Sequence, residues 1–391
     1  MRIGLDLPPQ MRVYGAFFMY AFCMGSLYPR LPEIQRVLAV PEGALGLALV
    51  GIAAGTLVSL TFAGPLIERI GYRRTMLSAL PLLSLAYAVA SFAAGPLAFF
   101  LLLLPVGLLI GAIEIIVNLE ADRVEHQIGR RIMNRSHAFW SFGFFASGLI
   151  GALVAQAGIS PQAQMLGMVP VIAIGVAVLL GRFDPAPHRS GGSAEPPPRF
   201  ALPTGPILVI VAVTLSAMLL EGAGIDWSAI YMTNVFDASP FIAGVAVATA
   251  AGAQALTRFF VDGFVERFSP AGVARTLLTL LGLSTVLILL APHPAVALLG
   301  FALIGVGSSA IFPLAMSAAA QRTDRPAATN VASLAQTSFV MFLLGPPMLG
   351  LVAEHFGIRW SFGITLPLVL LSFVCAGALG RAPVRPAPVV P

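Results

Sequence analysis

The stretch LLLLPVGLLIGAIEIIVNLEA, residues 101–121, decides what kind of protein this chain is. It contains an almost wholly apolar run of about 20 residues, the length that crosses the hydrocarbon core of a bilayer. A backbone in lipid finds no water for its N–H and C=O groups, so such a run must be a helix. The stretch therefore predicts a membrane-spanning helix that carries two acids, Glu114 and Glu120.

Apolar runs of similar length recur along the whole chain. Of the 391 residues, 58% are hydrophobic and 10% are charged, and the mean hydropathy of +0.92 lies outside the range of water-soluble domains. The alternation typical of membrane β-barrels is absent. We predict an all-α polytopic membrane protein with twelve spans, near 13–34, 44–66, 75–94, 97–121, 137–158, 163–181, 205–232, 240–266, 273–291, 295–319, 327–352 and 360–380.

The arginines predict the orientation of these spans, and the chain has no lysine to complicate the pattern. Of the 22 basic residues, eighteen fall on one side of the predicted spans, three fall on the other side, and Arg258 lies within a span. Because basic loops stay in the cytoplasm, both termini are expected there, in a bacterial inner membrane. The net charge of +5 then indicates contact with anionic lipid, and no nucleic-acid partner is expected.

The chain divides into two similar halves. A polar segment rich in Pro, Gly and Ser, RFDPAPHRSGGSAEPPPR at 182–199, separates six predicted spans from six. GPLIERIG at 64–71 recurs as DGFVERFS 198 residues later, and GLIGALVAQAGI at 148–159 recurs as PMLGLVAEHFGI 199 residues later. A nearly constant offset indicates a duplicated six-helix unit. We expect bundles at 1–181 and 205–380, a cytoplasmic linker at 182–204 and a Pro-rich cytoplasmic tail at 381–391.

One short motif carries a resemblance to a known family. GPLIERIGYRR at 64–74 resembles the loop between helices 2 and 3 of the major facilitator superfamily, and the resemblance extends over nearly the whole chain. In that family this loop locks the cytoplasmic bundle ends together in the outward-open state. The resemblance implies a gating role for the matching residues, with Glu68 in place of the usual Asp: Gly64, Glu68, Arg69, Gly71, Arg73 and Arg74. For Arg73 and Arg74, a solvated basic loop is the alternative.

The seventh predicted span narrows the resemblance. EGAGIDWSAIY at 221–231 is similar to a motif of poorly characterised bacterial carriers, and more loosely to fucose-type proton symporters. Drug–proton antiporters of the superfamily usually show an arginine within helix 4 and a Gly-Pro pair in helix 5. This chain has neither, which disfavours drug efflux.

Two acids are the candidates for proton coupling. A charged group at mid-bilayer costs roughly 2.5–3.5 kcal/mol on insertion scales, so an acid kept there is expected to be functional. Glu114 has no basic residue near it on its own helix face, and it matches the helix 4 acid of fucose-type symporters. Glu221 lacks a local cation, but Ser228 two turns away on the same face is an alternative partner.

Polar and aromatic side chains on the predicted spans are candidates for solute binding. They are Arg30, Asn118, His137, Trp140, Trp227, Gln254 and Gln336. For His137 the alternative is an interfacial helix cap, and for the two tryptophans it is packing or interface anchoring.

Three further charged residues are candidates for gating: Asp226, Arg258 and Asp262. Aligning the first and seventh spans brings Arg30 to nearly the level of Asp226, so we expect an ion pair between them when the outer side closes. Internal pairs that only hold the bundles together, Arg258–Asp262 and Arg30–Glu33, are the alternatives.

Other classes of function fit less well. The five histidines are scattered, HExxH-type spacing is absent, and no Walker motif occurs, so we expect no metal, no cofactor and no enzyme activity. The expected protein is a monomeric secondary carrier that moves a small polar organic solute by alternating access, with proton-coupled uptake. Proton-coupled efflux and a non-transporting membrane receptor remain the alternatives.

Overall fold

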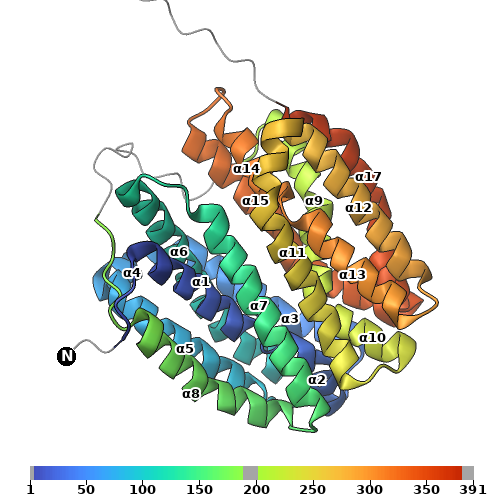
Figure 1. Cartoon of the computed structure of the whole chain (residues 1–391). Helices are drawn as coiled ribbons and strands as arrows, with labels where there is room; N and C mark the ends of the chain where they lie inside the picture. The colour runs from blue at the N-terminus through green and yellow to red at the C-terminus, as the bar shows by residue number, and fades with distance from the viewer. Residues whose placement is uncertain (1–3, 188–200, 381–391) are drawn as a thin grey trace, which may run out of the picture.

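The computed structural model describes residues 4–187 and 201–380, and every regular element within them is helical. Figure 1 shows a blue-to-green half lying against a yellow-to-red half. The first half contains α1 (Pro9–Met24), η1 (Tyr28–Arg30), α2 (Leu31–Leu38), α3 (Glu42–Phe62), α4 (Gly64–Ile70), α5 (Tyr72–Ala90), α6 (Pro96–Ile128), α7 (Met133–Gln156) and α8 (Pro161–Leu180).

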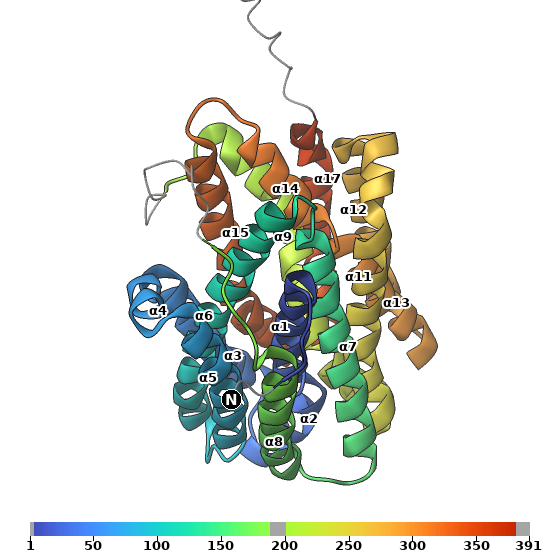
Figure 2. The ribbon, with the colours of Figure 1, turned by 60° about the vertical axis from the view of Figure 1, so that its left-hand side comes forward.

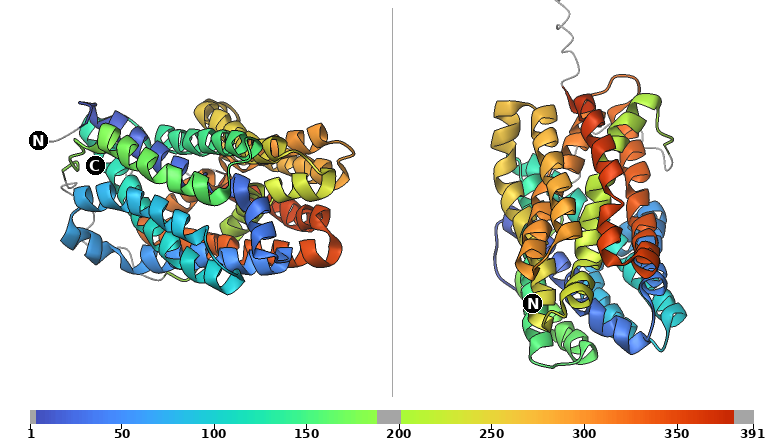
Figure 3. Two further views of the ribbon diagram at one scale, coloured as in Figure 1. Left: turned by 90° about the horizontal axis from the view of Figure 1, so that it is seen from below. Right: turned by 90° about the vertical axis from the view of Figure 1, so that its right-hand side faces the viewer.

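The second half repeats this pattern of long helices joined by short turns. It contains α9 (Gly205–Asp226), α10 (Ser228–Phe236), α11 (Pro240–Phe268), α12 (Pro270–Leu290), α13 (Pro294–Ser308), α14 (Ile311–Ala320), α15 (Ala327–Phe356), α16 (Ile358–Gly363), α17 (Leu366–Cys375) and η2 (Ala376–Leu379). Seen from below, the helices of the two halves lie side by side (Figure 3). The predicted all-α fold is confirmed.

Ten helical segments of the described residues are long and apolar enough to cross a membrane. The other two expected spans, 13–34 and 75–94, are also helical but differ in form. The first is divided into α1, η1 and α2, because Pro29 and Pro32 interrupt the helix and leave α1 with 16 residues. The second, α5, has 19 residues and begins with Arg73 and Arg74, which lower its hydropathy.

Two other expected spans also change direction part-way. The span at 205–232 is divided at Trp227, between α9 and α10, and the span at 295–319 is divided at Ser309 and Ala310, between α13 and α14. Such breaks release backbone groups from the helical pattern, and in lipid they are tolerated only where protein surrounds them. Both breaks lie close to the charged residues described below.

The halves meet along two helix pairs, α7 with α11 and α3 with α15. The first pair runs side by side in Figures 1 and 2. Small residues allow the close approach: a Cβ added at Gly244 of α11 would lie 2.6 Å from the Cβ of Ala152 on α7, and one at Gly46 of α3 would collide with the carbonyl of Pro346 on α15. The hydrophobic effect does not drive helices together in lipid, so small residues at such crossings stabilise the contact through close van der Waals packing.

Hydrogen bonds join the halves at one end, which we call the packed end. The backbone N–H of Gly43 at the start of α3 donates to Glu354 Oε2 at 3.2 Å, and that of Phe241 at the start of α11 donates to Gln156 Oε1 at 3.1 Å. Asn234 Nδ2 also donates to Glu42 Oε1 at 2.8 Å. The opposite end, which we call the α4 end, differs: α4 packs on α3, α5 and α6 of its own half, and it lies apart from α14 in Figures 1 and 2.

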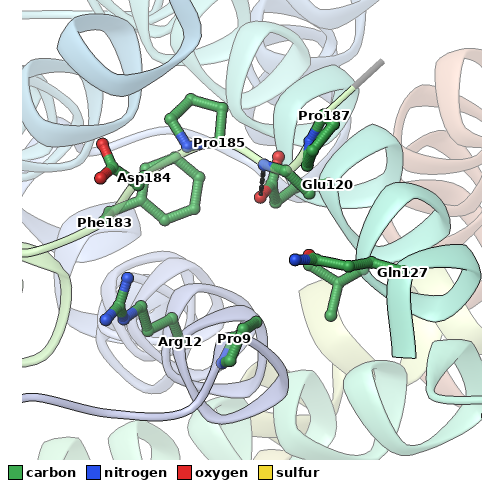
Figure 4. A pocket seen from close by; sticks show the side chains of 10 residues that line it. Pro9, Arg12, Glu120, Gln127, Phe183, Asp184, Pro185 and Pro187 are labelled. Carbon is green, nitrogen blue, oxygen red and sulfur yellow. Dashed lines mark hydrogen bonds between the residues drawn. The ribbon is translucent and has the colours of Figure 1, made fainter. Parts of the chain in front are cut away.

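The segments that connect the halves are anchored where the structure describes them. Ala186 donates its N–H to Glu120 Oε1 at 2.7 Å, and Ala201 donates to Gln336 Oε1 at 3.1 Å. Figure 4 shows the pocket of about 170 Å³ that residues 183–187 form with α1 and α6, where Arg12 and Gln127 face the same space. The rest of the expected linker and the expected tail, 188–200 and 381–391, lie outside the described residues.

Candidate functional site

Glu114 is held by its own helix and faced by α1. The amide of Asn118, one turn along α6, donates to Glu114 Oε1 and to the Glu114 carbonyl, each at 2.9 Å. The phenol of the buried Tyr20 on α1 faces the same carboxylate. Glu114 and Asn118 are only half-buried, although they lie in the middle of a 33-residue helix. Glu114 is therefore a partly exposed carboxylate whose neighbours, among the described residues, are polar and uncharged.

Arg258 of α11 is held by both halves. Its Nε donates to the Ser309 carbonyl at 3.0 Å, and its Nη1 donates to Ser141 Oγ of α7 at 2.9 Å. Its carboxylate partner is Glu221 of α9, whose Oε1 lies 3.6 Å from Nη2. The two residues lie on different helices, Arg258 on α11 and Glu221 on α9. Their pairing corrects the expectation that Glu221 lacks a local cation. Asp262, the alternative partner, lies one turn further along α11 and is exposed.

Gln254 and His137 border the same region. Gln254 is buried, accepts from Ser141 Oγ at 3.2 Å and donates to Ser308 Oγ at 3.4 Å, so it ties α11 to α7 and α13. His137 lies near the start of α7, packs edge-on against Phe17 with ring centroids 5.1 Å apart, and is within electrostatic range of Arg258. Arg258 thus lies near Glu221 and His137 and shares the hydroxyl of Ser141 with Gln254, although the sequence assigned these residues different roles.

Arg30 is not available to a solute in this structure. Its side chain is fully buried, and it donates to Gln164 Oε1, to Glu33 Oε2 and to the Ile159 carbonyl. The expected ion pair with Asp226 is not formed in this structure, where Arg30 bonds to these partners instead. The alternative pair Arg30–Glu33 is present. Arg30 serves to tie η1 to the start of α8.

Asp226 and Trp227 lie at the break between α9 and α10. Within the described residues, Asp226 has no ion pair or hydrogen bond to its side chain, and Tyr28 of the first half lies within its electrostatic range. Trp227 is fully buried and packs on Gly350 of α15, and its Nε1 has no partner in the described parts of the chain. Trp227 is therefore part of the packed end in this state, which corrects the expectation that it faces the solute.

The family motif forms α4 and the start of α5 and stays within its own half. Glu68, Arg69 and Arg74 are exposed. Arg73 donates from Nε to the Phe183 carbonyl at 2.7 Å and from Nη2 to the Gly181 carbonyl at 2.6 Å, so it caps the end of α8. Gly71 has a φ of 90°, a conformation that favours glycine, whereas a Cβ at Gly64 would meet nothing within 4 Å. Within residues 4–187 and 201–380, a lock against the other half is not formed here.

Two of the remaining candidates have other contacts. Trp140 stacks on Phe144 of its own helix, with ring centroids 5.4 Å apart. Gln336 accepts the N–H of Ala201 and so faces the end of the linker. Among the described residues, no group of three or more His, Cys, Asp and Glu side chains is placed to hold a metal ion.

The sequence interpretation missed the residues that close the packed end. The two donors Gly43 and Phe241 are 198 residues apart, and so are the two acceptors Gln156 and Glu354. This is the offset of the sequence repeat, so the two contacts are equivalent positions of the duplicated unit. The repeat was the signal that could have found them: each acceptor ends one long apolar run and each donor begins another.

Comparisons with known proteins agree with this geometry. The family model of the Major Facilitator Superfamily matches residues 13–227 and 209–391. An uncharacterised MFS-type transporter of Yersinia pestis is 28% identical over 375 residues, which cover 94% of each chain. The solved structure of the nucleoside transporter NupG has a TM-score of 0.70 at 17% identity, over 95% of this chain and 98% of that one.

The structure of a variant of the Escherichia coli fucose:proton symporter FucP also has the same fold. Its TM-score is 0.62 at 15% identity, and the match covers 96% of this chain and 99% of that one. At such identities the solved structures show the fold alone, whereas the family model spans nearly the whole sequence. The chain belongs to the major facilitator superfamily, and it is a multi-pass membrane transporter and not an enzyme.

Proposed function

We propose that this chain is a secondary active transporter that takes up a small polar organic solute together with protons, acting as a monomer by alternating access. The observation that carries the proposal is a set of ionisable side chains within the membrane-crossing helices, one of which, Arg258, contacts both halves. Glu114 in the first half and the Glu221–Arg258 pair in the second are partly exposed within membrane-crossing helices. Ionisable groups at that depth are costly and mark the path of a solute or an ion.

The arginine distribution supports an orientation. Arg69, Arg73 and Arg74 belong to the α4 end, on the side that holds eighteen of the 22 basic residues of the sequence. By the positive-inside rule, the α4 end is then cytoplasmic and the packed end faces outward. In this account both termini are cytoplasmic, the membrane is a bacterial inner membrane, and the structure represents an inward-facing state.

Glu114 is the first choice for the proton-coupling carboxylate and Glu221 the second. The contacts of Glu114 are neutral, Asn118 and Tyr20, so its charge is not balanced by a fixed cation among the described residues. A group of this kind can exchange a proton as its surroundings change from one side of the membrane to the other. Glu221 shares its region with Arg258, so its charge is balanced in this state.

The test is solute-driven proton movement in proteoliposomes that contain a trapped pH-sensitive dye. Sugars, nucleosides and organic acids are added in turn to the outside at equal pH on both sides. For each solute that radiolabelled uptake shows to cross the membrane, we expect acidification of the lumen. A transported solute that moves no protons would contradict the coupling, and a protein that binds solutes without moving any would contradict transport itself.

A further inference from the structure

The guanidinium of Arg258 is held at Nε and Nη1, and no hydrogen bond from Nη2 is found among the described residues. Its Nε and Nη1 donate to the Ser309 carbonyl at 3.0 Å and to Ser141 Oγ at 2.9 Å. These two bonds come from opposite halves and fix the plane of the group. A guanidinium has five N–H donors, so the two contacts leave donors on Nη1 and Nη2.

Glu221 balances the charge of Arg258 without using those donors. Its Oε1 lies 3.6 Å from Nη2, beyond the range of a hydrogen bond, and the two side chains are 19% and 15% exposed, respectively. A carboxylate that bound the guanidinium well would form two parallel hydrogen bonds of about 2.7–2.9 Å. Glu221 therefore balances the charge of Arg258 without a hydrogen bond and leaves the Nη2 donors available to another carboxylate.

Arg30 shows the contrast. It also lies beside a carboxylate, Glu33, but it is fully buried and donates to Gln164 and to the Ile159 carbonyl as well. Its hydrogen bonds are made within the protein, which is the arrangement of a structural arginine. Of these two arginines, Arg258 is the partly exposed one, so it is a better candidate for binding a solute than Arg30.

We propose that Arg258 binds the carboxylate of an organic anion, and that this carboxylate takes the place of Glu221 beside the remaining donors on Nη1 and Nη2. The inference rests on the proposed transport function and names its substrate class. The planar fork of an arginine matches a carboxylate geometrically. An anion that displaces Glu221 adds one negative charge, and one proton bound with it leaves the net charge of the region unchanged, which joins solute binding to proton uptake.

The experiment is thermal unfolding of the full-length protein in detergent with matched acid and amide probes. Benzoate, lactate and succinate are each compared with benzamide, lactamide and succinamide, because an acid and its amide have nearly the same shape. A ligand that binds the folded state raises the unfolding temperature with its saturation. We expect at least one acid to stabilise the wild-type protein and its amide to have no effect.

Single variants distinguish the role of Arg258 from that of Arg30. Arg258→Gln should abolish the stabilisation by the acid, and Arg258→Lys should weaken it, because a lysine keeps the charge without the fork. Glu221→Gln removes the internal competitor and should lower the half-saturating acid concentration about two- to fivefold, the effect expected for a partly exposed ion pair. Glu33→Gln is the matched control, since it makes the same change beside Arg30 and should leave that concentration unchanged.

The Glu221→Gln result keeps the test decisive even if the Arg258 variants fail to fold. An acid affinity that falls or stays the same in Glu221→Gln would overturn the proposal, and so would acids that act no better than amides on the wild-type protein. If neutral sugars or nucleosides are transported with protons while acids have no effect, the substrate class is wrong and the proposed transport function stands. If acids bind as expected but no solute crosses the membrane, the transport function is wrong.

Discussion

At the scale of single residues, Glu114 and Glu120 lie on the same helix in different surroundings. Glu114 is half-buried and has the amide of Asn118 and the phenol of Tyr20 as neighbours. Glu120 is buried and accepts the N–H of Ala186 at 2.7 Å. Glu120 thus holds the segment after α8 in place, whereas Glu114 is the carboxylate that we propose exchanges a proton.

This difference predicts the effect of removing each charge. Glu114→Gln keeps a side chain that Asn118 can still bond but cannot carry a proton, so proton-driven accumulation should be lost while exchange of solute between the two sides continues. Glu120→Gln is the matched control and should accumulate solute normally. Both are measured with radiolabelled solute in proteoliposomes under an imposed pH gradient. Uphill transport by Glu114→Gln would remove Glu114 from the coupling mechanism.

A second residue prediction concerns Arg30. Its loss leaves Gln164, Glu33 and the Ile159 carbonyl without their donor, so Arg30→Gln should lower the free energy of unfolding by about 1–3 kcal/mol. The exposed Arg36, near the same end, is the control, and Arg36→Gln should change it by less than about 0.5 kcal/mol. Unfolding in mixed micelles measures both. Equal effects would contradict a structural role for Arg30.

The same contacts predict the result of a charge swap. Arg30 and Asp226 do not pair in this structure, so the double variant Arg30→Asp with Asp226→Arg should transport no better than the worse single variant. Transport by each variant is measured as radiolabelled uptake into proteoliposomes. Recovery of transport in the double variant would show that the two residues meet in another state of the cycle.

The sequence could predict which residues are charged within the membrane but not which of them meet. The contact between Glu114 and Asn118 could be read from the sequence, because a helix of known period puts residues four apart on one face. The pair Arg30–Glu33, three residues apart, was likewise among the alternatives from the sequence. Gln164 on α8 as a partner of Arg30, and the partners of Arg258 on α7 and α9, come from other helices. Helical periodicity carries no information about contacts between helices, so those assignments needed the structure.

At the scale of helices, the packed end is held by helix termini that are capped from the other half. Gly43 is the second residue of α3 and Phe241 the second residue of α11, and their N–H groups have no partner within their own helices. Glu354 and Gln156 supply the acceptors, each from the last turn of a helix in the other half. Opening of the packed end therefore breaks the capping hydrogen bonds at the starts of α3 and α11.

We expect loss of either cap to favour opening of the packed end. Glu354→Ala and Gln156→Ala should each destabilise the closed end by about 0.5–2 kcal/mol, the usual contribution of a helix cap. Glu354→Gln keeps an acceptor and should lose only the favourable interaction of the charge with the helix dipole, about 0.3–1 kcal/mol. A single cysteine at Ala248, which is 2% exposed, reports opening through its reaction with a membrane-impermeant maleimide. Unchanged labelling in both alanine variants would contradict this role.

At this scale, the sequence did not predict the breaks within the long helices. Apolar length predicted where helices lie, and ten of the segments satisfy it directly. It did not predict the breaks at Trp227 and at Ser309, because each expected span is long enough to continue through its break. Pro313, four residues after Ser309, has no N–H to donate to the Ser309 carbonyl, and it was the signal for the second break. Arg258 donates to that carbonyl instead.

At the scale of the whole molecule, the two ends have different roles in the cycle. The packed end is joined across the halves by hydrogen bonds, whereas α4 at the other end packs on its own half. If the halves rock about the residues between them, opening of the packed end brings the α4 end together. Glu68 and Arg69 are exposed here and would then reach the second half. Glu68→Ala should therefore remove contacts that stabilise only the other state.

The measurement that tests this account most directly is a pair of spin-label distances in lipid, with Cys23 and Cys375 replaced. Labels at Val37 and Phe356 report the packed end, and labels at Leu66 and Phe268 report the α4 end, since all four side chains are exposed. The account predicts two populations in the wild-type protein, in which a longer distance at one end accompanies a shorter distance at the other. It also predicts that Glu68→Ala retains only the state described here, because a gap of a few kcal/mol decides which state dominates. Distances that change at both ends in the same sense, or populations that Glu68→Ala leaves unchanged, would contradict alternating access locked by α4.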